Sequence, residues 1–225
     1  MSNVSAVLAA LQFGDSFFPS GSVSFSWGLE GLAASGPVVD GEGVLAFVVG
    51  QLHARWRDCD RPIVVASHRA AGPEEVAEID SYVEAATAAA ELRSASSRVG
   101  QAMLSVFGRL GFAAATAYRA RVKQGAAHGH LAVMQGYLWR EAGLSETDAV
   151  ALSAHTFSTA LLGAGIRLGC LTHTEAQKAL LAIREQVAEM AAAPLPALKQ
   201  ISTFAVEAEI AVMRHAKSET RMFAN

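Results

Sequence analysis

Helix-forming residues fill most of this 225-residue sequence, and alternating runs of β-branched and polar residues, the pattern of a half-buried strand, are nearly absent. Apolar residues recur instead at helical spacing, as in the stripe of Ala176, Leu180 and Ile183. We therefore predict an all-α fold. Residues 1–200 are expected to form one multi-helix, bundle-like domain, and residues 201–225 a C-terminal helix or tail that docks on a partner.

Local signals predict where the helices begin and end. Capping or first-turn residues occur at Asp40–Gly43, at Pro73, at Ser145–Asp148 and at Thr172–Glu175. The sequence between and after these signals predicts helices over residues 81–92, 99–110, 112–123 and 131–140, and a long apolar helix that ends near Arg167. Pro194 and Pro196 are expected to separate the tail from the preceding helix, because proline does not continue a helix.

The composition limits the class of protein. Hydrophobic residues make up 52% and charged residues 17%, which excludes a disordered chain and predicts either a large core or an apolar homodimer interface. A net charge of −3 gives no electrostatic reason to expect nucleic acid as a partner. Cys59 and Cys170 form no C-x-x-C pair and no disulfide framework, so we expect a reducing, cytoplasmic location.

Two apolar stretches raise the question of a membrane. Residues 1–14 contain no Lys or Arg and so lack the basic start of a signal peptide. Residues 149–166 are uncharged, but a membrane span needs about 20 apolar residues. This stretch also carries Ser153, His155 and Thr156, which suit a helix buried in protein. We expect no membrane span.

Catalytic and nucleotide-binding signatures are absent from the sequence. It contains no G-x-x-x-x-G-K-[ST] loop for phosphates and no H-E-x-x-H, G-x-S-x-G or S-x-x-K motif. The glycines Gly163, Gly165 and Gly169 have a spacing close to that of a dinucleotide loop, but they end an apolar helix instead of following a strand. We therefore expect them to allow close helix packing, and we predict no catalytic residues and no firmly bound cofactor.

Histidines offer a weak metal-binding signal. His128 and His130 lie two residues apart, with His68 elsewhere in the sequence, and imidazole suits nickel and zinc. Residues at this spacing do not share a helix face, and no third possible ligand stands at a sequence spacing typical of metal sites. We favour a polar loop that enters the helix at Leu131, with His128 and His130 kept as weak metal candidates.

The most distinctive segment runs from Leu11 to Glu30. Its Pro, Gly and Ser residues predict a turn at Pro19–Ser22 between two helices, with Ser24 or Ser26 capping the second one. The aromatic residues around the turn are expected to form one cluster; they are Phe17, Phe18, Phe25 and Trp27. Turn chemistry alone explains this segment as an elbow between helices.

The same segment resembles the N-terminal signature of the UreF family of urease accessory proteins. The matching positions are Pro19, Gly21, Ser26, Gly28, Leu29 and Glu30. The resemblance continues in order through His130–Gly136, Arg167-Leu168, Glu175–Gln177, Glu209–His215 and Arg221–Phe223, so it covers nearly the whole chain. Val23 replaces the usual aromatic residue and Ala216 a common acid, so the contacts of these two positions stay open.

The resemblance implies a function without catalysis. Proteins of this family are all-α, dimeric adaptors that bridge a D-type (or H-type) accessory protein and a G-type GTPase, and the complex inserts nickel into apo-urease. The resemblance implies that the whole complex handles nickel. It leaves open the sign and size of any effect that this chain has on GTP hydrolysis by the GTPase. The partner-binding residues that the resemblance implies are Pro19, Gly21, Ser26, Glu30, Arg167, Gln177, Arg214, His215, Arg221 and Phe223.

Alternative predictions remain for the C-terminal tail and for the function of the chain. The tail is expected to become ordered when partners bind, with Arg221 and Phe223 as anchors, whereas the alternative is a final helix over Val206–Met213 that packs on the bundle. A nickel-binding metallochaperone that uses surface histidines is the second functional hypothesis, and a small all-α enzyme with scattered active-site residues is the third.

Overall fold

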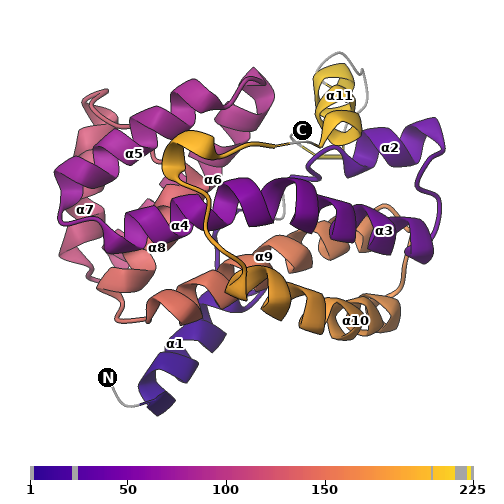
Figure 1. The fold of residues 1–225 in the computed structure, drawn as a ribbon, viewed down its shortest axis with the longest axis horizontal. Coiled ribbons are helices and arrows are strands. Elements are labelled where there is room, and N and C mark those ends of the chain that lie inside the picture. Colours follow the sequence, from indigo (N-terminus) through magenta and orange to yellow (C-terminus); the bar gives the residue numbers. More distant parts are fainter. Residues whose placement is uncertain (1–2, 22–24, 204, 216–221, 224–225) are drawn as a thin grey trace. The chain divides into compact units, whose positions relative to one another are not determined.

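A computed structural model describes residues 3–21, 25–203, 205–215 and 222–223 of the chain. Within these residues the regular elements are helices and there is no strand, which confirms the predicted all-α class (Figure 1). In chain order the elements are α1 (Asn3–Gly14), α2 (Leu29–Ser35), α3 (Gly41–Gln51), the π-helix η2 (Leu52–Asp60), α4 (Arg61–Arg69), α5 (Pro73–Ala86), α6 (Ala90–Arg109), α7 (Ala113–Lys123), α8 (Leu131–Glu141), α9 (Glu146–Arg167), α10 (His173–Ala192), the 3₁₀-helix η3 (Leu198–Gln200) and α11 (Val206–His215).

The contacts within the chain divide it into two compact units. Unit 1 consists of Met1–Gly21 and Asp60–Ser153, and unit 2 of Ser22–Cys59 and Ala154–Asn225. Helix α9 contributes residues to both units, so the chain crosses between them inside a helix. The predicted boundary between residues 200 and 201 stays a prediction.

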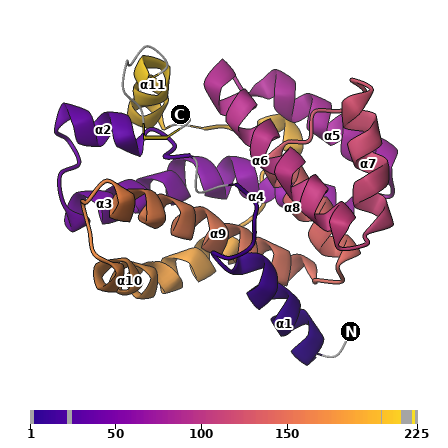
Figure 2. The ribbon, with the colours of Figure 1, turned by 180° about the vertical axis from the view of Figure 1, so that it is seen from behind.

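Unit 1 is built around α8. Helices α4 and α6 pack on α8, and α7 packs on α6 (Figure 2). Gly136 makes the contact with α4 possible, because a Cβ atom there would lie 2.2 Å from the backbone oxygen of Val64. Gly100 does the same for α6, where a Cβ atom would lie 2.1 Å from the backbone oxygen of Gly129. Two glycines thus set the distance at which α4 and α6 approach the α8 region.

Unit 2 combines two helix pairs, α10 on α3 and α11 on α2. Gly165 near the end of α9 would, with a Cβ atom, approach Leu171 within 2.4 Å and Val44 within 2.9 Å, so the expected close packing is confirmed at this position. A Cβ atom on Gly163 would meet nothing within 4 Å. A Cβ atom on Gly169 would meet nothing within 4 Å either, so close packing explains one of the three glycines.

Several predicted helix starts are confirmed. The Asp40 side chain accepts a hydrogen bond from the Gly43 amide at 2.9 Å and caps α3. Helix α5 begins at Pro73, as its proline and first-turn acids predict. Thr172 and Glu175 form a reciprocal capping box at the start of α10. These starts depend on residues close together in sequence, which is why the pattern predicts them.

The bounds of two predicted helices, residues 81–92 and 99–110, are wrong. Helix α5 ends at Ala86, and α6 runs without a break through residues 90–109. The break at Thr87–Ala89 contains no glycine or proline to mark it. Arg93 reaches back from α6 and donates hydrogen bonds to the carbonyl oxygens of Thr87 and Ala88, which satisfies backbone groups beyond the end of α5.

The predicted single aromatic cluster and the Ser26 cap are also wrong. Phe18 packs with Phe13 and Phe107 in unit 1, whereas Phe25 and Trp27 belong to unit 2. Phe17 packs in neither group, because 93% of its surface is exposed. Helix α2 has Gly28 as its N-cap, without a side-chain cap, and Ser24 lies outside the described residues.

The long apolar helix α9 has the character of a core helix. It is the single described helix that is long and apolar enough to cross a membrane, and 61% of its apolar window is buried within the structure. A helix that buries most of its apolar residues against its own chain needs no lipid to cover them.

Substituting Gly136 tests the packing of unit 1. Gly136→Ala is expected to lower the free energy of unfolding by about 1–3 kcal/mol, because the added methyl group collides with the α4 backbone. Chemical denaturation followed by circular dichroism measures the loss. The control Gly163→Ala adds a methyl group in open space within a helix and should raise stability by up to about 1 kcal/mol. Equal effects of the two substitutions would contradict the packing argument.

Candidate functional site

Three of the predicted partner-binding residues, Glu30, Arg167 and Phe223, meet in unit 2. The Glu30 carboxylate, in the first turn of α2, accepts hydrogen bonds from the backbone amides of Met222 at 2.7 Å and Phe223 at 3.1 Å. The Phe223 side chain is 4% exposed, and the Arg167 guanidinium lies 4.1 Å from the centre of its ring. Glu30 and Phe223, 193 positions apart in sequence, thus form one site with Arg167.

The backbone before α2 explains how this site forms. Trp27 and Gly28 have positive φ angles of 54° and 91°, so the chain turns sharply into the helix. A Cβ atom on Gly28 would lie 2.6 Å from the backbone oxygen of Ala208, and one on Gly31 would lie 3.2 Å from Ala211. The two glycines let α11 lie directly on the start of α2, the helix that carries Glu30.

The alternative prediction for the tail was a final helix over Val206–Met213, and the structure has a helix there. Helix α11 occupies residues 206–215, and Ala208, Ala211 and Val212 are buried. Ile210 and Met213 remain partly exposed, at 38% and 47%. Whether the tail changes when a partner binds stays a prediction.

The remaining predicted partner-binding residues are scattered. Pro19 and Gly21 are exposed in unit 1, and Gly21 has a φ of 76°. Ser26 is fully buried in unit 2, so it offers no surface to a partner in this conformation. Gln177 and Arg214 are exposed on α10 and α11.

Two predicted residues cannot be placed in the same way. His215 ends α11, and its side chain lies outside the described part of the structure, as does all of Arg221. The role of every residue in the predicted set stays a prediction.

The predicted histidine loop is held by a buried carboxylate in unit 1. Asp80 on α5 has no exposed surface and accepts hydrogen bonds from the backbone amides of His128 and Gly129 at 2.7 Å and of His130 at 2.9 Å. The Tyr118 hydroxyl donates a further hydrogen bond at 3.0 Å. Four donors thus satisfy the carboxylate, as a buried charge requires.

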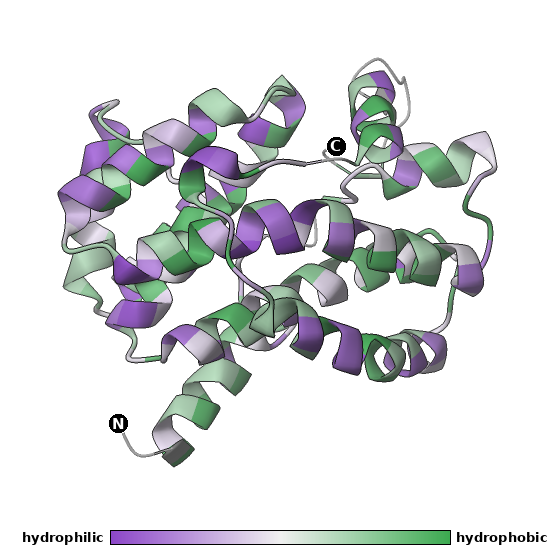
Figure 3. Cartoon of the chain, in the orientation of Figure 1, coloured by the Kyte–Doolittle hydropathy of each residue, from purple (hydrophilic) through white to green (hydrophobic). Residues whose placement is uncertain are grey.

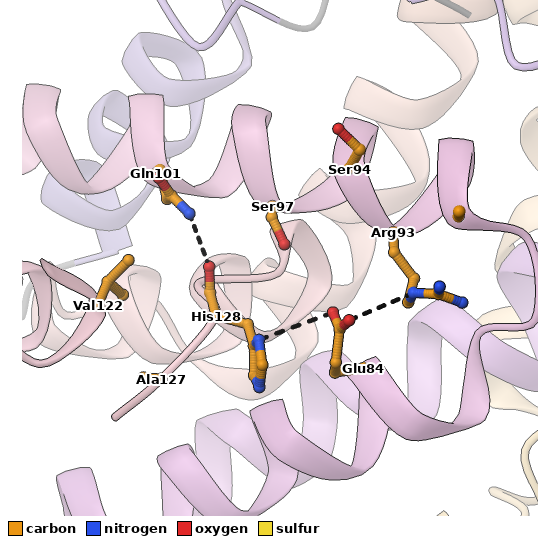
Figure 4. A pocket seen from close by; sticks show the side chains of 9 residues that line it. Glu84, Arg93, Ser94, Ser97, Gln101, Val122, Ala127 and His128 are labelled. Atoms are coloured by element: carbon orange, nitrogen blue, oxygen red, sulfur yellow. Dashed lines mark hydrogen bonds and ion pairs between the residues drawn. The ribbon is translucent and has the colours of Figure 1, made fainter. Parts of the chain in front are cut away.

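Both histidine side chains face Glu84. His130 Nε2 lies 2.9 Å from the Glu84 carboxylate and His128 Nδ1 lies 3.7 Å from it, while Arg93 forms an ion pair with the same carboxylate at 3.2 Å. Figure 4 shows Glu84, Arg93 and His128 beside a pocket of about 360 Å³. Burial lowers the pKa of His130, and the carboxylates of Asp80 and Glu84 oppose this effect.

The metal hypothesis for this loop stays a prediction. Among the residues that the structure describes, no group of three or more His, Cys, Asp or Glu side chains is arranged to hold a metal ion. His68, the third histidine of that hypothesis, has its Nε2 atom 3.0 Å from the backbone oxygen of Leu144. In the described structure His130 Nε2 lies within hydrogen-bonding distance of Glu84, and His68 Nε2 within that of the Leu144 carbonyl.

Helix α1 carries a surface that the sequence analysis missed. Val4, Val7, Leu8 and Leu11 follow one helix face at i, i+3, i+4 and i+7 spacing and are 68%, 50%, 61% and 65% exposed. The helix contains no acidic or basic residue, and Figure 3 shows its apolar character. The spacing was visible in the sequence, but only the structure shows that this face stays uncovered. We call these four residues the α1 stripe.

Comparisons with known proteins agree in one family. The family model described as UreF matches residues 38–184. The chain is 32% identical to a protein named urease accessory protein UreF from Trichodesmium erythraeum, and the alignment covers 100% of this chain and 99% of that protein. Proteins of the same name from Yersinia enterocolitica and Yersinia pseudotuberculosis are each 25% identical, over 99% of this chain and 100% of theirs.

The Asp80 network predicts a large effect of a small substitution. Asp80→Asn should lower the free energy of unfolding by about 3–5 kcal/mol. Both carboxylate oxygens accept backbone hydrogen bonds, and in asparagine an NH₂ group, which is a donor, takes the place of one of them. Denaturant unfolding measures this loss. Asp148→Asn, which alters an exposed cap of α9, is the control and should cost about 1 kcal/mol. A loss at Asp80 no larger than the control would contradict the network.

The lowered pKa of His130 predicts a pH dependence of stability. The native state favours the neutral ring, so this contribution is complete above the ordinary pKa of 6.5 and is lost as falling pH protonates the unfolded chain. The free energy of unfolding should therefore fall from about pH 7.5 to about pH 5.5, and His130→Gln should make the fall shallower. Parallel pH profiles of the wild-type chain and His130→Gln would refute the assignment.

Proposed function

This chain belongs to the UreF family of urease accessory proteins, and we propose that it serves urease maturation as a non-catalytic adaptor. In this proposal the chain bridges a UreD/UreH-type accessory protein and a UreG-type GTPase while nickel is inserted into apo-urease. The names of the relatives support the process, since each is called an accessory protein. Nickel is the cargo of the assembled complex, and no firmly bound cofactor is assigned to this chain.

The observation that carries the adaptor role is the α1 stripe. Four aliphatic side chains, each at least 50% exposed, form a continuous face on a helix without charged residues. Such a face suits contact with another protein, because burying it stabilises a complex by about 25 cal/mol for each Å² of apolar surface. Catalysis would instead need converging reactive groups.

Other apolar surfaces support an assembly of several chains. A groove of about 700 Å³ in unit 2 is lined mainly by apolar residues of α2, α3 and the start of α11, among them Leu32, Phe47 and Val206. The 52% hydrophobic content is consistent with the proposed homodimer. We also propose that the chain is cytoplasmic, where its proposed partners act. An influence on GTP hydrolysis by the UreG-type partner belongs to the same proposal.

Co-purification tests the adaptor role. The tagged chain, expressed with UreD/UreH-type and UreG-type proteins and urease subunits, should retain these partners, whereas Leu8→Asp should lose at least one of them. The loss is expected because a carboxylate in the α1 stripe would be buried without a partner. The unfolding midpoint of Leu8→Asp should stay close to that of the wild-type chain, since Leu8 is 61% exposed.

Leu181→Asp provides the matched control for this experiment. Leu181 lies on α10, outside the α1 stripe, and is 63% exposed. The control should retain every partner. If the wild-type chain captures none of the proteins, the adaptor role is wrong, and if Leu8→Asp captures all of them, the α1 stripe is not the contact surface.

A further inference from the structure

One stretch of unit 1 carries basic residues and no acidic ones. Residues 92–140, which include most of α6, all of α7 and nearly all of α8, contain no Asp or Glu, although the whole chain has 21 acidic and 18 basic residues. The Arg and Lys residues of this stretch are Arg93, Arg98, Arg109, Arg119, Arg121, Lys123 and Arg140. Positive charge is thus gathered on these helices without acids of the same stretch to offset it.

Some of these cations are used inside the structure. They form ion pairs with acids that lie outside the stretch, and these pairs are Arg93–Glu84, Arg121–Glu74 and Arg140–Glu141. Arg109, Arg119 and Lys123 are exposed instead, and among the residues that the structure describes none of the three is in an ion pair. Arg109 donates a hydrogen bond to the Ser105 hydroxyl, which is a neutral group. We call Arg109, Arg119 and Lys123 the basic face.

The basic face lies on two helices that pack together (Figure 2). Arg119 and Lys123 are four residues apart and so lie on the same side of α7, with Cβ atoms about 5–6 Å apart. Arg109 ends α6, and the two helices approach closely beside it, because a Cβ atom on Gly108 would lie 3.2 Å from the Thr116 hydroxyl oxygen. A molecule that covers α7 therefore meets cations from both helices.

Small side chains surround these cations. The exposed small residues of α7 are Ala113, Thr116, Ala117 and Ala120. Short side chains let the backbone of a second helix come close, because the distance between packed helices depends on the side chains at the contact. Such a surface suits a helix better than nucleic acid or a membrane. The one aromatic ring of α7, Tyr118, is buried and cannot stack on a base, and α7 exposes no large apolar side chain that could enter a lipid layer.

The helix dipole explains only part of this charge pattern. Arg109 and Lys123 lie in the last turns of α6 and α7, where the dipole favours cations. Arg119 lies before the last turn, and α7 and α8 have no acid in their first turns, where the same dipole favours one. The absence of acids from the whole stretch therefore needs a reason outside the helices themselves, and binding of an acidic surface provides one.

We propose that the basic face binds an acidic helix of a partner protein. Carboxylates four residues apart on that helix match the spacing of Arg119 and Lys123. The α1 stripe, in the same unit, is apolar, so the chain offers two surfaces of different chemistry, as an adaptor needs to hold two different partners. Assigning the acidic helix to a protein of urease maturation rests on the proposed adaptor function, whereas the chemistry of the helix does not.

Charge reversal in the full-length chain tests this surface. With the UreD/UreH-type protein, the UreG-type protein and the urease subunits as probes, the double variant Arg119→Glu with Lys123→Glu should bind one of them roughly tenfold more weakly or worse, because like charges then face each other. The wild-type affinity for that partner should fall as salt is added, and the double variant should lose this dependence. Both side chains are exposed, so the unfolding midpoint should stay close to that of the wild-type chain.

The matched control is the double variant Lys178→Glu with Arg184→Glu. It makes the same change of net charge at exposed positions of α10, in unit 2, and should leave the affinity unchanged. A carbodiimide, which joins a contacting amine and carboxylate without a spacer, should link Lys123 to an Asp or Glu of the bound partner. Equal losses of affinity in the two double variants, wild-type affinity for every partner after charge reversal on α7, or a bound partner without this link would overturn the proposal.

A synthetic helix tests the same chemistry without any maturation protein. The probe is an Ala-rich peptide with pairs of Glu four residues apart, and the same peptide with Gln in place of Glu is its control. At low salt the Glu peptide should shift the NMR signals of the α7 amides more than those of α10, and the Gln peptide should shift neither. An α7 without shifts overturns the proposal, as does binding of phosphatidylserine vesicles or duplex DNA through Arg119 and Lys123 while the peptide stays unbound. If the wild-type chain captures no maturation protein, the adaptor function fails, while the peptide still decides the basic face.

Discussion

Asp80 carries a carboxylate without exposed surface, and the organisation of unit 1 depends on how that charge is satisfied. Three consecutive backbone amides, from His128 to His130, and the Tyr118 hydroxyl all donate to it. An unpaired buried charge would cost several kcal/mol, so the loop before α8 has to adopt this one conformation. Because α4 and α6 both pack on α8, the position of the loop also determines where these helices find their contacts.

Unit 2 depends on close backbone contact between α2 and α11. Gly28 and Gly31 leave room for Ala208 and Ala211, and Glu30 on the same helix accepts hydrogen bonds from Met222 and Phe223. The positions that carry the family resemblance at Ser26–Glu30 therefore have a packing role as well as any role in partner binding.

Predictions from sequence succeeded where the determining residues are near neighbours. The caps of α3 and α10 follow from a side chain and an amide three residues away, so the local pattern contains the whole interaction. The end of α5 was missed because Arg93, from the next helix, donates to the carbonyl groups of Thr87 and Ala88 just beyond it. The predicted aromatic cluster failed for a similar reason, since composition near a turn does not show which core each ring joins.

The sequence by itself determined the all-α class, most helix starts and the family, because helical periodicity, caps and ordered motifs are written in consecutive residues. It also marked Glu30, Arg167 and Phe223 as separate candidates. Only the tertiary structure decided that these three residues share one site, and that His128 and His130 face Glu84. The physical reason is distance along the chain: such contacts depend on how helices pack, and a local pattern carries no record of the surface that a helix will meet.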